Sequence, residues 1–145
     1  MIVAIFIRPP QFYSHFSSNR SRHTMPSPEL TLSLFLRLAV VSHERGQMLP
    51  RNKFLILAGA AACTAAWLPV AVRCRELVLG NNAAHMLHRF ETFPDALRSG
   101  EFQVYLKQLG KFCSIERAEH LLDSQGVDSA VLSEADAIQI LDQLA

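Results

Sequence analysis

The feature that most constrains this chain is an uncharged, apolar run over residues 54–72. Arg51 and Lys53 stand just before the run, and Arg73 and Arg75 stand just after it. As one helix, rising about 1.5 Å per residue, the run would be about 28 Å long, which is close to the thickness of a bilayer's hydrocarbon core. The sequence therefore predicts a hydrophobic helix here. The first interpretation is a single-pass membrane anchor, with membrane lipid as its partner.

Two other interpretations of the run remain open. Met48 begins a short basic segment, the apolar run follows, and small residues up to Ala66 could form a cleavage site. This order is typical of a signal peptide that is cleaved during export. The third interpretation is a buried core helix. It is favoured because the many alanines of the run contribute little to membrane insertion and Pro69 would kink or end a helix. The pattern at Met48 also suggests the hypothesis that translation starts there, with residues 1–47 as read-through of upstream sequence.

The region before the run is predicted to be largely irregular. Residues 11–28 are rich in Ser, Arg, His, Asn and Pro, a composition that cannot bury enough apolar surface to offset the entropy of ordering. Residues 29–42 are apolar again. Their leucines alternate with a strand-like period of two, although leucine itself favours helices. We expect an interfacial or partly ordered helix there.

Charge is divided along the chain. Residues 1–85 carry a net charge of +6 and residues 86–145 a net charge of −5, so the whole-chain value of +1 hides a basic front and an acidic back. A basic segment beside an apolar run suits a membrane surface. The acidic half argues against nucleic acid as a partner, because affinity for phosphate comes from Lys and Arg.

Residues 92–145 have the most regular helical pattern. Thr92 and Asp95 form a capping box, and apolar residues recur at spacings of three and four over 101–113. Ser114 and Ser133 are predicted to cap two further helices, and Gly126 to end the first of these. The predicted fold class is mainly α, with one hydrophobic helix followed by a small three-to-four-helix bundle.

The predicted organisation has four segments: an extension (1–47), the hydrophobic segment (48–75), a connector (76–91) and a small acidic helical domain (92–145). A bundle of this last size is only marginally stable alone. We therefore expect a partner, a second copy or the membrane to complete its core.

Motifs for chemistry are few. His85 and His88, spaced by three, fall on one face of a helix and could hold a metal or haem iron with a third ligand. No cofactor motif supports such a site, and no other cofactor is predicted. The three cysteines form no close pair, so neither a disulfide framework nor a zinc knuckle is predicted. No catalytic residue is identified.

The function that this pattern favours is a small membrane-anchored or exported protein. Its helical module would bind another protein, or a second copy of itself, rather than catalyse a reaction. The predicted contact residues are Phe90, Phe93, Phe102 and Tyr105, which are otherwise ordinary members of the core. The alternative function is a metal- or haem-binding module that uses His85 and His88.

Overall fold

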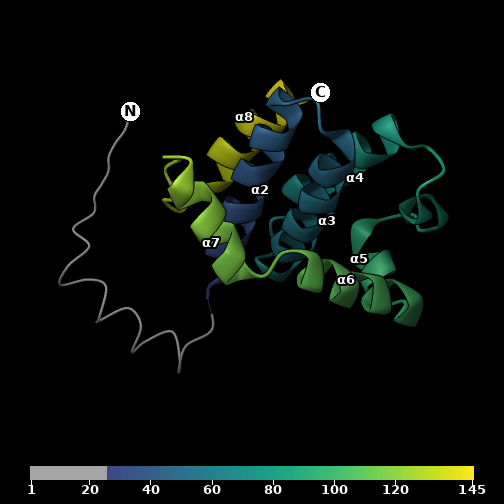
Figure 1. Cartoon of the computed structure of the whole chain (residues 1–145). Coiled ribbons are helices and arrows are strands. Elements are labelled where there is room, and N and C mark those ends of the chain that lie inside the picture. The colour runs from purple at the N-terminus through teal and green to yellow at the C-terminus, as the bar shows by residue number, and fades with distance from the viewer. Residues whose placement is uncertain (1–25) are drawn as a thin grey trace.

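Three consecutive helices form the centre of the molecule. A computed structural model describes residues 26–145, and within them every regular element is a helix. Helices α2 (Pro28–Glu44), α3 (Met48–Thr64) and α4 (Leu68–Asn81) follow one another through short turns and pack side by side (Figure 1). The prediction of a mainly helical fold is confirmed.

Shorter elements surround these three helices. They are the 3₁₀ turn η2 (Met86–Arg89) and helices α5 (Phe93–Leu97), α6 (Gly100–Phe112), α7 (Ile115–Ser124) and α8 (Glu134–Gln143). Both α5 and α6 pack on α3, α7 packs on α2, and α8 packs on α4 and α2. The last two helices of the chain therefore lie against the first helices that the structure describes.

Helix α2 differs from the prediction for this part of the chain. Residues 29–42 were expected to form an interfacial or partly ordered helix. They belong to a regular helix whose side chains are buried nearly all round. The alternating leucines explain this, because a period of two on a helix places apolar side chains on two opposite faces. Ser27 caps the helix by accepting the N–H of Leu30 at 3.1 Å. Residues 11–25 of the predicted irregular stretch (11–28) lie outside the described residues.

The apolar run over residues 54–72 is not one helix. Helix α3 ends at Thr64 and α4 starts at Leu68, so Pro69 lies in the first turn of α4, where its missing N–H is not needed. Among residues 26–145, no helix combines the length and the apolar character needed to cross a membrane. The prediction of one continuous hydrophobic helix is therefore wrong, while the predicted location of the protein stays a prediction.

The turns at both ends of α3 and at the end of α7 share one geometry. After α3, the N–H of Trp67 bonds to Ala62 O at 2.8 Å and that of Ala66 to Cys63 O at 3.1 Å. The same two hydrogen bonds follow α2 and α7. In each turn, the first of the two donor residues along the chain has a left-handed backbone conformation. That residue is Gly46 or Gly126 in two of the turns and Ala66, with a φ of 64°, in the third.

The predicted helix boundaries in the second half are largely confirmed. Thr92, Ser114 and Ser133 each accept an N–H three residues on, and Gly126 stands just after α7. The predicted connector (76–91) is partly helical, because α4 continues through Gly80 and ends at Asn81. The short 3₁₀ turn η2 follows within the same connector.

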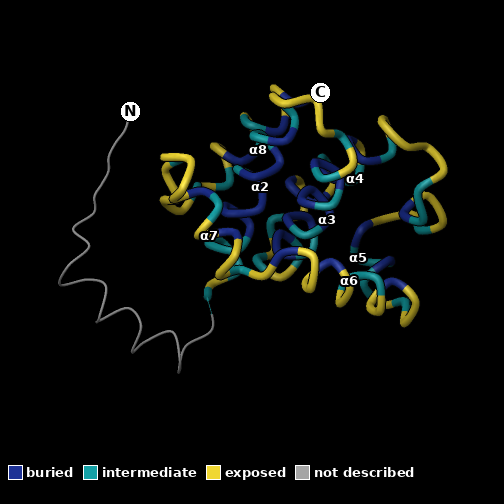
Figure 2. Tube along the Cα trace, in the orientation of Figure 1, coloured by how far each residue is buried: buried dark blue, intermediate teal, exposed yellow. Residues whose placement is uncertain are grey.

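Buried apolar side chains form one cluster that runs through the central helices (Figure 2). Leu34 on α2, Ile56 on α3 and Val78 on α4 belong to it, together with Phe102 on α6 and Leu141 on α8. The cluster thus contains residues from both sides of the predicted domain boundary at residue 92.

Candidate functional site

The four aromatic residues predicted as contact residues lie together. The ring of Phe102 is at the centre, with ring-centroid distances of 5.9 Å to Phe93, 6.1 Å to Phe90 and 5.8 Å to Tyr105. Phe93 and Phe102 are fully buried, whereas Phe90 and Tyr105 are half-buried. Only the latter two are therefore placed to touch a partner, and the buried pair belongs to the core.

The two histidines predicted as metal ligands have different surroundings. His85 is half-buried, its Nδ1 accepts the N–H of Leu87 at 3.1 Å, and its Nε2 lies 3.2 Å from the Tyr105 hydroxyl. Because Nδ1 is an acceptor, the proton of the neutral ring is on Nε2, which donates to Tyr105. Burial lowers the pKa of His85. His88 is exposed, and among residues 26–145 no three His, Cys, Asp or Glu side chains gather as a metal site.

The cysteines are free thiols in an apolar setting. Burial raises the pKa of Cys74 to about 12 and that of Cys63 to about 11. It also raises the pKa of Cys113. Since the thiolate is the reactive form, burial lowers the reactivity of all three thiols.

An apolar groove lies between α2, α3, α6 and the start of α7. Its volume is about 470 Å³. It is lined by Thr31, Phe35, Leu57, Ala60, Ala61, Thr64, Leu106, Gly110, Cys113, Ser114, Ile115 and Glu116. Sequence reasoning missed this site, because its walls come from four separate elements. The one local signal is a small residue, Gly110, one turn after Leu106 in a strongly amphipathic helix.

A second cavity, which we call the polar pocket, lies where the ends of α2, α3, α4 and α8 meet. Its volume is about 490 Å³. It is lined by His43, Met48, Arg51, Arg73, Glu76, Leu77, Gly80, Asn81, Leu144 and Ala145. Sequence reasoning treated Arg51 and Arg73 only as the charged flanks of the apolar run.

Arg51 is the most deeply placed polar residue of this pocket, with 3% of its surface exposed. Its Nη2 donates to Leu77 O at 3.0 Å, its Nε donates to Asn52 Oδ1 at 3.2 Å, and its Nη1 lies 3.2 Å from His43 Nδ1. Asn52 in turn donates to Asn81 Oδ1 at 2.7 Å. Burial lowers the pKa of Arg51, but a guanidinium stays charged at neutral pH.

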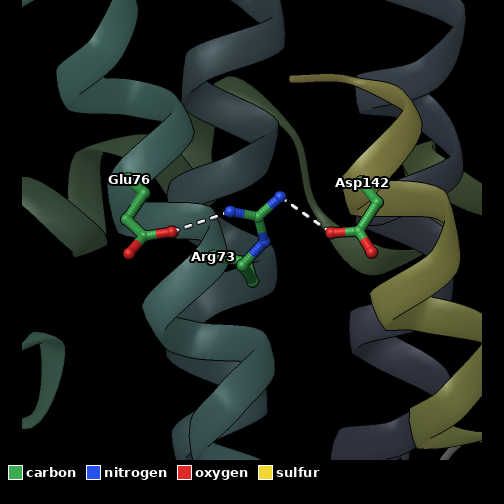
Figure 3. Close-up of polar contacts among 3 residues, drawn as sticks. All are labelled: Arg73, Glu76 and Asp142. Carbon is green, nitrogen blue, oxygen red and sulfur yellow. Dashed lines mark hydrogen bonds and ion pairs between the residues drawn. The ribbon is translucent and has the colours of Figure 1, made fainter.

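Arg73 lines the same pocket and joins two helices, as Figure 3 shows. Its Nη1 lies 2.8 Å from Glu76 on α4, and its Nη2 lies 2.7 Å from Asp142 on α8. The hydrogen bonds to Glu76 and then to Asp142 raise the pKa of Arg73. Unlike Arg51, this arginine therefore has its charge balanced by carboxylates within the protein.

Over the residues that the structure describes, the fold and these sites define a small helical protein with an apolar groove and a polar pocket. Comparison of the chain with models of protein families, with curated proteins and with solved structures finds no match.

Proposed function

We propose that this protein is an interaction module whose apolar groove takes up apolar side chains of a partner protein. The observation that carries the proposal is the groove itself, of about 470 Å³ and walled by apolar and small side chains. Half-buried Leu57 and Leu106 leave apolar surface in contact with water, and covering such surface contributes about 25 cal/mol per Å².

Small residues give the groove its depth. Ala60 and Ala61 on α3 and Gly110 on α6 lack the side chains that would otherwise fill the space between these helices. Bulky anchors of a partner, such as Leu or Phe, commonly bind in pockets of this kind and supply most of the binding free energy. The proposed partner is thus a peptide segment with bulky apolar residues.

The exposed side of α6 supports the same assignment. Phe112 is 38% exposed, although it is apolar. The ring of Phe112 lies 5.5 Å from that of Phe54 and has the ammonium of Lys53 at 4.6 Å. This aromatic residue therefore stands at the surface in a defined position, as expected of a side chain that meets a partner.

Peptide selection with a groove-filling variant tests the proposal. The substitution Gly110→Leu places a side chain in the groove, and a Cβ at Gly110 would meet no atom within contact distance. A random peptide library displayed on phage is selected against the natural protein. We expect peptides rich in bulky apolar residues, with affinity reduced about tenfold or more for Gly110→Leu, which corresponds to about 1.4 kcal/mol.

Val104→Leu is the matched control, because it adds apolar volume on α6 at a residue that does not line the groove. Selected peptides should bind this control as well as they bind the natural protein. Peptides that bind Gly110→Leu with unchanged affinity would contradict the proposal. Light scattering on the same proteins identifies self-association: if only Gly110→Leu stays monomeric, the partner is a second copy.

A further inference from the structure

The polar pocket contains a buried cation whose charge the described part of the chain does not balance. Within residues 26–145 the ion pairs involve Arg73, Arg89 and Arg98, and none involves Arg51. The groups that Arg51 contacts are a backbone carbonyl, an amide and an imidazole nitrogen. We propose that the polar pocket binds an oxyanion, the carboxylate or phosphate group of a small ligand, through Arg51.

The hydrogen bonding of Arg51 leaves room for such a ligand. A guanidinium has five N–H donors, and three are used by the contacts to Leu77, Asn52 and His43. One N–H on each terminal nitrogen has no further acceptor among residues 26–145. Two such donors on one planar group match the two oxygens of a carboxylate or phosphate.

One helix N-terminus reaches the same place. Met48, the first residue of α3, lines the pocket, so the N-terminal end of α3 is part of its wall. Gln47 gives no side-chain cap, and the first turn of α3 contains no acidic residue. The positive end of the α3 dipole therefore meets Arg51 at this pocket. The C-terminal ends of α2 and α4, at His43 and Asn81, bring the negative ends of their dipoles to the same pocket, so the case for an anion rests on Arg51.

Other residues of the pocket limit what the ligand is. Arg73 is held at the rim by Glu76 and Asp142, so that part of the rim is close to neutral. Leu77 and Leu144 add apolar surface, and Asn81 adds an amide. With a volume of about 490 Å³, the pocket suits a small organic anion whose charged end meets Arg51 and whose remainder meets this mixed wall.

Gly80 allows a test that does not disturb Arg51. It lines the pocket near the end of α4, and a Cβ there would meet no atom within contact distance. The substitution Gly80→Glu supplies a carboxylate from within the chain, and Gly80→Gln supplies the same shape without charge. If the pocket needs an anion, Gly80→Glu should melt at a higher temperature than Gly80→Gln.

Inorganic phosphate and acetate serve as probes, each compared with chloride at equal ionic strength. Affinity is measured by calorimetric titration of the full chain. We expect the natural protein and Gly80→Gln to bind a probe, and Gly80→Glu and Arg51→Met to bind it at least about tenfold more weakly. Tighter binding of phosphate than of acetate would identify a phosphate ligand, and the reverse order a carboxylate ligand.

Two results would overturn the inference. One is that neither probe binds the natural protein or Gly80→Gln beyond the chloride control. The other is that Gly80→Glu binds as tightly as Gly80→Gln while both are folded. The comparison at Gly80 remains decisive if Arg51→Met fails to fold, because both of its members keep the hydrogen bonds of Arg51.

Discussion

Gly59 occupies the point where helix α5 comes closest to α3. A Cβ added at this residue would lie 2.8 Å from Cζ of Phe93 and closer still to Cε2. The ring of Phe93 is fully buried and packs edge-on against that of Phe102, so it has little room to move aside. Helix α5 can therefore pack here because Gly59 has no side chain.

We predict that Gly59→Ala lowers the stability of the protein. Alanine is favoured over glycine in a helix by about 1 kcal/mol, but overpacking a core typically costs about 1–3 kcal/mol. Urea unfolding measures the balance. Gly110→Ala is the control, because it lies in α6 with open space around it and should raise stability. Equal gains from both substitutions would show that Phe93 yields without cost.

Single residues were predicted well where their role is local. Thr92, Ser114 and Ser133 were recognised as helix caps, because a cap acts on an N–H only three residues away. Gly59 and Arg51 were not recognised. Their roles depend on Phe93 and Leu77, which approach only after distant parts of the chain have packed.

Among the elements, the turn between α3 and α4 was the one least visible in the sequence. Ala65, Ala66 and Trp67 contain none of the glycine or proline that usually marks a turn, and alanine is the best helix former. Packing overrides this preference, since both α2 and α4 lie against α3 and the chain has to reverse to place them there. A length-based argument could not detect such a reversal.

We predict that Ala66→Gly raises stability by up to about 1 kcal/mol. Ala66 has a φ of 64°, a left-handed conformation that costs a residue with a Cβ about 1–2 kcal/mol. The greater entropy of glycine in the unfolded chain offsets about 0.5–1 kcal/mol of this gain. Thermal and urea unfolding are the measurements. The reverse substitutions, Gly46→Ala and Gly126→Ala, occupy equivalent turns and should both lower stability; a loss with Ala66→Gly would refute the strain argument.

For the molecule as a whole, the charge asymmetry of the sequence has an internal counterpart. Arg73 of the basic front pairs with Asp142 of the acidic back, and the burial that lowers the pKa of Arg37 is opposed by Asp128 and Asp136. Arg37 also donates to the backbone oxygen of Ala130 at 2.8 Å. Part of the charge that suggested a membrane surface thus faces the other half of the same chain.

The whole-molecule question left open by the sequence is whether residues 92–145 fold by themselves. In the structure their two last helices bury apolar residues against the first half: α7 packs on α2, and α8 packs on α4 and α2. Ser33 of α2 also accepts the N–H of Leu132 at 2.8 Å, which ties the segment before α8 to α2. We therefore predict that a fragment of residues 92–145 shows no cooperative thermal transition.

Circular dichroism during heating of this fragment and of residues 26–145 makes the comparison. The longer chain keeps the shared core of α2, α3 and α4, and should melt in one sigmoidal transition, whereas the fragment should lose its helical signal gradually. The physical reason is size and geometry: a few short helices without the surface that they cover bury too little apolar area to offset their conformational entropy. A sigmoidal melt of the fragment alone would instead establish residues 92–145 as an independent domain. The contacts with α2 and α4 would then represent the docking of one folded unit on another.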